Sequence, residues 1–382
     1  MVQAVVVGWQ VYEITKDPLS LGLIGLAEAI PAITVSLYAG HLADIVERKK
    51  IILVCVITLV LCSVALLFFT LNMGAFILQN GALPIYAVIF FSGIARGFLS
   101  PANFSFMPQL VSRELYQNAI TWNSTVWEGA AVGGPMIGGL IYGFFGITAA
   151  YCVDAALVTA GLVCYSLIPN RALPPITAEQ GIWEKISAGI KFVFNNQIIL
   201  GAITLDLFAV LFGGAVALLP VFADDILQVG KIGLGFLRSA PSIGAVLMAV
   251  YLTHYPIKKR LGKILLWCVA GFGFCMIGFG LSTSFWLSMI LLILSGVFDC
   301  VSVVTRSTMI HTLTPENMKG RVSAVNSIFI GSSNEIGAFE SGAVAKLLGT
   351  VRSVVFGGVM TLAVVSVTAW KAVKLRRLDK VD

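Results

Sequence analysis

Charged side chains are scarce in this sequence. Asp, Glu, Lys and Arg make up 12% of the 382 residues, whereas hydrophobic residues make up 58% and the mean hydropathy is +0.93. A soluble domain carries about twice that share of charge. So little polar surface excludes a globule in water, and we infer that lipid surrounds most of the chain.

Signals for metal, redox and catalytic chemistry are also missing. The seven cysteines all lie in apolar stretches without a Cys-x-x-Cys pair, and no Cys/His cluster has metal-ligand spacing. No nucleophile–base set or phosphate loop lies at an expected membrane face. A cleavable signal peptide is not indicated either. We therefore predict no metal, no cofactor and no enzymatic activity.

Long apolar runs are what the sequence does have. A helix needs about 20 apolar residues to cross a bilayer, and only helices satisfy the backbone there without a closed barrel. Eleven runs reach this length, and a shorter segment covers 1–14. The runs are 19–43, 50–72, 84–108, 117–141, 146–168, 198–221, 231–254, 262–281, 285–313, 320–345 and 350–371. The predicted fold class is an all-α polytopic membrane protein.

Basic residues gather in alternate connections between these runs, which fixes the orientation because cytoplasmic loops are rich in Lys and Arg. On the side of the membrane with few basic residues lie only Lys16, Lys231, Lys346 and Arg352. The basic C-terminal tail lies on the side that is rich in Lys and Arg. The C-terminus is therefore predicted to be cytoplasmic. The net charge of +6 reports this topology and does not indicate nucleic-acid binding.

The two halves of the chain repeat one another in the same direction. Pro31 corresponds to Pro241 at an offset of 210 residues, and Gly134 corresponds to Gly337 at an offset of 203. A parallel repeat of a six-helix unit is expected for a major facilitator. We predict halves at 1–168 and 198–382, joined by a cytoplasmic linker at 169–197 that contains an amphipathic helix on the inner membrane surface. By the same offset the first helix is expected to be incomplete, as in an N-terminally truncated chain.

Two motifs have a recognisable spacing. Gly40-His41-Leu42-Ala43-Asp44 leads into Arg48, Lys49 and Lys50 after the second span, and it resembles the major facilitator signature of the loop between helices two and three. Ile45 replaces the usual arginine of that signature. A second motif, Gly134-Pro135-x-x-Gly138-Gly139, resembles the signature of the export branches of that superfamily. Glycines on one face permit close helix packing, and proline removes a backbone donor.

Further stretches are similar to one branch, the enterobactin-exporter-like transporters, with macrolide-efflux proteins as near relatives. They include Trp9 to Glu13, Ser100 to Val111 and Thr314 to Val322. The resemblance implies a secondary exporter of the bacterial inner membrane that is driven by the proton gradient, but it does not fix the substrate. We predict a monomeric antiporter that carries a small amphipathic molecule, such as a drug, a macrolide or a siderophore, by alternating access.

Charged residues inside the expected spans are the site candidates, since such residues usually face a cavity or a partner. Arg96 and Glu128 fall midway along neighbouring spans, where an ion pair is expected, and Asp299 and Glu335 fall near the midplane of the other half. Glu28 and Asp206, expected nearer the interfaces, complete the set. One acid would carry the proton and the other residues would hold the substrate; structural ion pairs between helices are the alternative role.

Two other functions stay open at this stage. A proton-coupled importer is opposed only by the resemblance of Gly134-Pro135 to the export signature. A non-transporting, truncated membrane protein would explain the short first helix.

Overall fold

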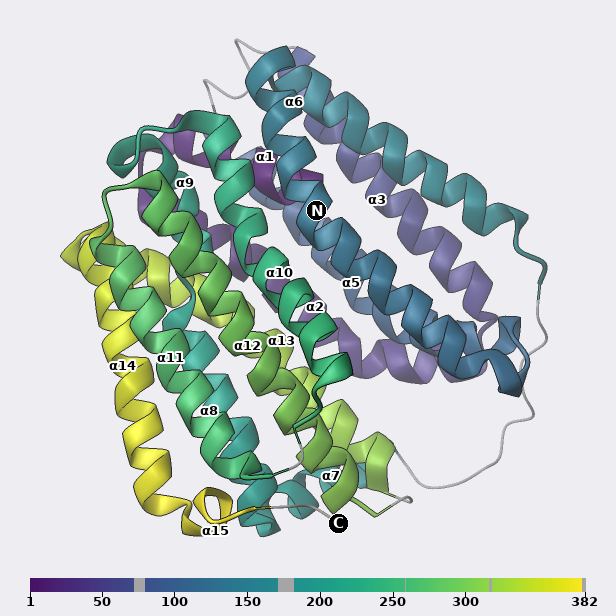
Figure 1. Cartoon of the computed structure of the whole chain (residues 1–382). Coiled ribbons are helices and arrows are strands. Elements are labelled where there is room, and N and C mark those ends of the chain that lie inside the picture. Colours follow the sequence, from purple (N-terminus) through teal and green to yellow (C-terminus); the bar gives the residue numbers. More distant parts are fainter. Residues whose placement is uncertain (72–79, 171–181, 258, 316–317, 380–382) are drawn as a thin grey trace. The chain divides into compact units, whose positions relative to one another are not determined.

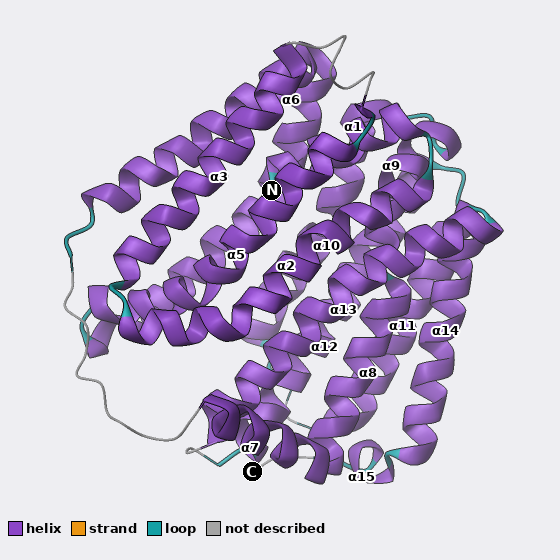
Figure 2. Cartoon of the chain, turned by 180° about the vertical axis from the view of Figure 1, so that it is seen from behind, coloured by secondary structure: helices purple, strands orange, loops and turns teal. Residues whose placement is uncertain are grey.

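The computed structural model describes residues 1–71, 80–170, 182–257, 259–315 and 318–379, and its regular structure within these ranges is helical throughout (Figure 2). The surroundings of Gly40 and the side chain of Asp44, near the end of the second helix, lie outside what is described. The predicted all-α fold class is confirmed.

The helices follow the predicted apolar runs closely (Figure 1). In chain order the main helices are α1 (Val2–Thr15), α2 (Pro18–Ile45), α3 (Arg48–Leu71), α5 (Leu83–Leu110), α6 (Tyr116–Leu167), α7 (Ile182–Asn195), α8 (Gln197–Gly213), α10 (Gly230–His254), α11 (Leu261–Leu281), α12 (Phe285–Leu313), α13 (Lys319–Leu348) and α14 (Thr350–Lys371). Short elements are η1 (Arg113–Leu115), η2 (Ala215–Leu218), α9 (Leu219–Val221), the π-helical η3 (Phe222–Ile226) and α15 (Val373–Arg376).

Nine helices of the described part are long and apolar enough to cross a membrane. Two predicted runs, 117–141 and 146–168, form the two arms of α6 on either side of a turn at Gly146. The run at 320–345 forms α13, whose serine, asparagine and glutamate residues lower its hydropathy. The chain is therefore a multi-pass membrane protein.

Helix α6 contains a sharp change of direction at Gly146, where φ is 83° and ψ is 175°. Only glycine adopts this backbone region readily. Gly349, which separates α13 from α14, has φ 91° and ψ 153° and lies 203 residues further along the chain. The predicted repeat thus recurs in backbone conformation, because each half makes the same glycine turn at the same position.

The chain divides into two compact units. The N-terminal unit holds Met1–Glu179 together with Gly230–Phe236, the first turns of α10; the C-terminal unit holds Gln180–Val229 and Leu237–Asp382. Helix pairs α2–α5, α3–α5 and α3–α6 pack within the first, and α11–α14, α11–α12 and α8–α13 pack within the second.

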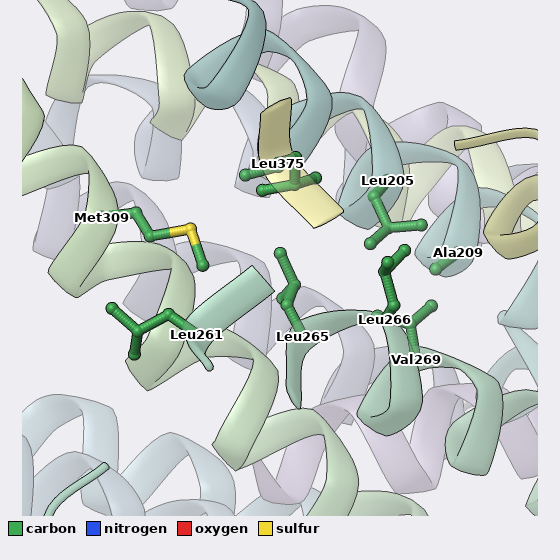
Figure 3. Close-up of a cluster of buried hydrophobic side chains, with 9 residues drawn as sticks. Leu205, Ala209, Leu261, Leu265, Leu266, Val269, Met309 and Leu375 are labelled. Atoms are coloured by element: carbon green, nitrogen blue, oxygen red, sulfur yellow. The ribbon is translucent and has the colours of Figure 1, made fainter. Parts of the chain in front are cut away.

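A buried cluster of aliphatic side chains holds the C-terminal unit together (Figure 3). Leu205 and Ala209 of α8, Leu265 and Val269 of α11 and Leu375 of α15 belong to this cluster. Leu205, Leu265 and Leu375 are fully buried. Burial of each such side chain contributes roughly 1.5–3 kcal/mol in water; within a membrane, close packing supplies the attraction.

Helix α7 occupies the second part of the predicted linker; residues 171–181 of that linker lie outside the described ranges. Val193 of α7 is fully buried against Ile199, Ile310 and Val322. Asn196 then begins α8 by accepting hydrogen bonds from the backbone N–H groups of residues 198 and 199. The end of the linker is thereby fixed to the C-terminal unit.

Candidate functional site

The N-terminal unit contains an ion pair midway along its apolar helices. Arg96 of α5 donates through Nη1 to Glu28 Oε1 of α2 at 2.7 Å, and its Nη2 lies 3.4 Å from Gln3 Oε1 of α1. Side-chain exposure is 44% for Arg96 and 24% for Glu28. A guanidinium exposed at this depth is expected to face water in a cavity, because exposure to lipid would be costly.

This pairing corrects two expectations. Arg96 was expected to pair with Glu128, but its carboxylate partner is Glu28, so Glu28 shares the depth of Arg96 and does not lie nearer an interface. Glu128 is half-buried on α6. Counting positions along each span gives depth only roughly and does not reveal which helix faces which, and α2 and α5 are packed closely together.

Tight packing of α5 on α2 sets up this pair. A Cβ atom added at Gly93 would lie 2.5 Å from the Glu28 carbonyl oxygen and 2.9 Å from Pro31 Cγ. The two helices therefore approach within backbone contact one turn before Arg96. That approach brings the guanidinium and the carboxylate within hydrogen-bonding distance.

Other polar side chains of the N-terminal unit are also paired. Ser63 donates to Asp154 Oδ2 at 2.7 Å, and Tyr151 donates to Gln10 Oε1 at 2.6 Å. Tyr142 donates to Glu13 Oε2 at 2.9 Å. Sequence reasoning missed Gln3 and Gln10, because a search for charged residues in apolar runs passes over amides.

The glycine-rich motif of α6 packs against backbone, as its composition predicts. A Cβ atom at Gly138 would lie 3.3 Å from Val2 Cα, and one at Gly139 would lie 2.8 Å from Gly235 Cα within the same unit. Gly134 lies against Met1, and Pro135 is buried. Side chains larger than hydrogen would separate these segments.

The basic residues after the second span donate to backbone carbonyls, and Lys49 does so at the end of a helix. Arg48 Nη1 donates to the Ser105 carbonyl at 3.1 Å, and Lys49 Nζ donates to the Ser166 carbonyl at 2.9 Å and to that of Ile168. Cations are favoured at a helix C-terminus, where carbonyl groups lack partners. Lys49 thus fastens the start of α3 to the end of α6.

The C-terminal unit holds a different ion pair. Arg306 of α12 pairs with Asp206 of α8, and their side chains are only 3% and 7% exposed. Asp206, which was expected nearer an interface, lies level with Arg306 toward the C-terminal end of α12. Beside the pair, Asp206, Asp299 and Ser302 line a small pocket between α8, α11 and α12. Glu335 is half-buried on α13 and is not part of this lining.

Comparison with known proteins agrees with this architecture. The family model described as transmembrane secretion effector, of the major facilitator superfamily, matches residues 1–382. The chain belongs to the transmembrane secretion effector family. The family consists of transporters, so an enzyme is not the function class.

Curated relatives of this secretion effector family member include proteins named enterobactin exporter EntS. The protein of Shigella boydii serotype 4 is 29% identical over 362 residues, covering 94% of this chain and 85% of the relative. The protein of Escherichia coli O81 is 28% identical over 339 residues, covering 88% and 80%.

Solved structures share the fold at low sequence identity. A bacterial homologue of the iron transporter ferroportin, in an inward-facing state, has a TM-score of 0.68 at 15% identity, covering 98% of this chain and 96% of that one. A POT family transporter in complex with 5-aminolevulinic acid has a TM-score of 0.72 at 11% identity, covering 98% and 93%. These likenesses establish the major facilitator fold.

Proposed function

We propose that this transporter exports a small amphipathic molecule, a siderophore or a macrolide-like compound, from the bacterial cytoplasm in exchange for protons. Export rather than import is supported by one observation, the similarity along most of the chain to relatives named as enterobactin exporters. The C-terminus and the basic loops would face the cytoplasm, in the orientation that their charge favours.

The substrate site in this proposal is the group formed by Arg96, Glu28 and Gln3. Arg96 remains partly exposed although it is paired, and the buried Gln3 Nε2 atom finds no hydrogen-bond acceptor among the described residues. Both side chains can donate hydrogen bonds to acceptor oxygens of a substrate. A buried amide donor without a partner costs free energy, which a bound acceptor would recover.

Glu128 is the proposed proton carrier. It is half-buried on an apolar helix, and the Arg96 guanidinium binds Glu28 rather than Glu128. Among the described residues, Arg96 and Glu128 form no ion pair, which leaves this carboxylate available for the proton in the proposal. One proton moving down 100 mV releases about 2.3 kcal/mol, which supports roughly a fifty-fold substrate gradient.

Inside-out membrane vesicles test the direction. With an acidic interior, we expect accumulation of at least one compound from a panel of enterobactin, a macrolide and a cationic dye. Arg96→Gln should abolish accumulation, whereas Arg352→Gln, which removes an exposed arginine of α14, should preserve it.

Accumulation in right-side-out vesicles but not in inside-out vesicles would identify an importer instead and contradict the proposal. Equal accumulation by wild type and Arg96→Gln would exclude the proposed substrate site while leaving the direction established.

A further inference from the structure

The pocket between α8, α11 and α12 combines oxygen ligands with an apolar surround. Asp206, Asp299 and Ser302 supply its oxygen atoms, and the remaining lining is aliphatic, aromatic or thiol. Asp299 and Ser302 lie three residues apart on α12, so both project from one face of the helix. Arg306, one further turn along that face, is the residue that pairs with Asp206.

Ser302 gives this pocket an unused polar atom. The residue is 3% exposed, and its buried hydroxyl finds no hydrogen-bond partner among the described residues. Most buried hydroxyls are hydrogen-bonded, and an unsatisfied one costs about 1–3 kcal/mol. Serine on the same helix is satisfied elsewhere: the Ser295 hydroxyl donates to the Leu292 carbonyl at 2.7 Å.

We propose that this pocket binds a small alkali-metal cation, with sodium as the probe. Carboxylate and hydroxyl oxygens are ligands that hard cations prefer. An alkali ion would use both carboxylates and the Ser302 hydroxyl together, whereas a proton would bond to one carboxylate and leave the hydroxyl unused. The described residues contain no group of three or more His, Cys, Asp or Glu side chains that could hold a metal ion, so the proposed site depends on the Ser302 hydroxyl as its third ligand.

The position of the pocket between helices predicts that the bound ion stabilises the folded chain. Asp206 belongs to α8, and Asp299 and Ser302 belong to α12, so an ion shared between them holds the two helices together. Ala209 and Val269, which line the pocket, also belong to the buried aliphatic cluster shown in Figure 3. Binding to the folded state alone raises stability with ion concentration. This inference is independent of the substrate, direction and proton coupling proposed above.

Thermal unfolding of the full chain in detergent tests the proposal. At constant pH and ionic strength, sodium chloride replaces choline chloride, and the unfolding midpoint is recorded. We expect a saturable rise with sodium. Ser302→Ala should weaken the apparent affinity about tenfold, because it removes one of three ligands, which corresponds to about 1.4 kcal/mol. Asp299→Asn should abolish the response.

Ser295→Ala is the matched control, because it removes a buried serine hydroxyl of α12 that lies outside the pocket. It should keep the wild-type response to sodium. If Asp299→Asn does not fold, the contrast between the two serine variants decides the test.

Three results would overturn the proposal: no saturable effect of sodium on the wild type, the same apparent affinity in both serine variants, or a wild type that responds to pH but not to sodium. The last result would assign the pocket to a proton.

Discussion

Arg96 in the N-terminal half and Asp299 in the C-terminal half occupy corresponding positions at the repeat offset of 203 residues. The helices around them also correspond, since α5 ends at Leu110 and α12 ends at Leu313. The halves therefore share helix boundaries and turns but carry opposite charge at the same place. The two halves thus resemble each other in backbone more than in the polar side chains that the backbone carries.

The two ion pairs differ in their surroundings as well. Arg96 and Glu28 are 44% and 24% exposed, whereas Arg306 and Asp206 are 3% and 7% exposed. An exposed pair contributes little to stability but is accessible to a ligand, and a buried pair cannot lose one partner without a large cost. The difference in exposure supports the proposed substrate contact for the first pair and indicates that the second pair holds helices together.

Removal of one partner from the buried pair should have the largest effect on stability. Asp206→Ala leaves the Arg306 guanidinium unpaired in the core, and we expect a loss of about 3–5 kcal/mol. The measurement is reversible unfolding of the purified chain in detergent. The double replacement Asp206→Leu with Arg306→Met should recover most of that loss, and equal instability of single and double variants would contradict the assignment.

The glycine turns should respond alike in both halves. Gly146→Ala and Gly349→Ala each force a side chain into a backbone region that favours glycine, at about 1–3 kcal/mol apiece. Unfolding of each single variant measures the cost. Gly161→Ala is the control, because no neighbouring atom lies within 4 Å of the new Cβ, and it should not destabilise the chain. If only one of Gly146→Ala and Gly349→Ala lowers the stability, the two glycine turns are not equivalent.

The glycine face of α6 should tolerate substitution unevenly. Gly139→Ala places a Cβ atom 2.8 Å from Gly235 Cα, so we expect a loss of about 1–2 kcal/mol from overpacking. Gly129→Ala on the same helix meets no atom within 4 Å and should be neutral or slightly stabilising. Indistinguishable unfolding of the two variants would show that close packing at Gly139 is not required.

The exposed pair should show the smallest effect on stability. Glu28→Ala is expected to lower the free energy of unfolding by about 1 kcal/mol or less. The same variant should reduce transport at least tenfold, because it removes one charged contact of the proposed substrate site. Unfolding and vesicle transport are measured on the same preparation. A loss of stability as large as that of Asp206→Ala would remove the functional difference between the two pairs.

Helix positions were readable from the sequence because membrane spans must be long and apolar. The run predicted at 285–313 is α12 to the residue, and the run at 262–281 begins one residue inside α11. The glycine and proline pattern of the fifth span also indicated its packing face, since close backbone approach requires that composition.

The partners of the charged residues were not readable in the same way. Pairing depends on which helices are neighbours and how each is rotated, and depth along a span gives neither. Arg96 was therefore matched with Glu128 instead of Glu28, and the burial of Asp206 with Arg306 was missed. Gln3 carries no charge, so no pattern marked it as a neighbour of Arg96.

Proton movement during transport tests the central claim most directly. The chain is placed in inside-out vesicles that have an acidic interior and contain a pH-sensitive dye. When a transported substrate is added outside, protons should leave the vesicle interior. Glu128→Gln should abolish this release, while Glu114→Gln, which neutralises an exposed acid before α6, should keep it. Undiminished proton release by Glu128→Gln would contradict the account.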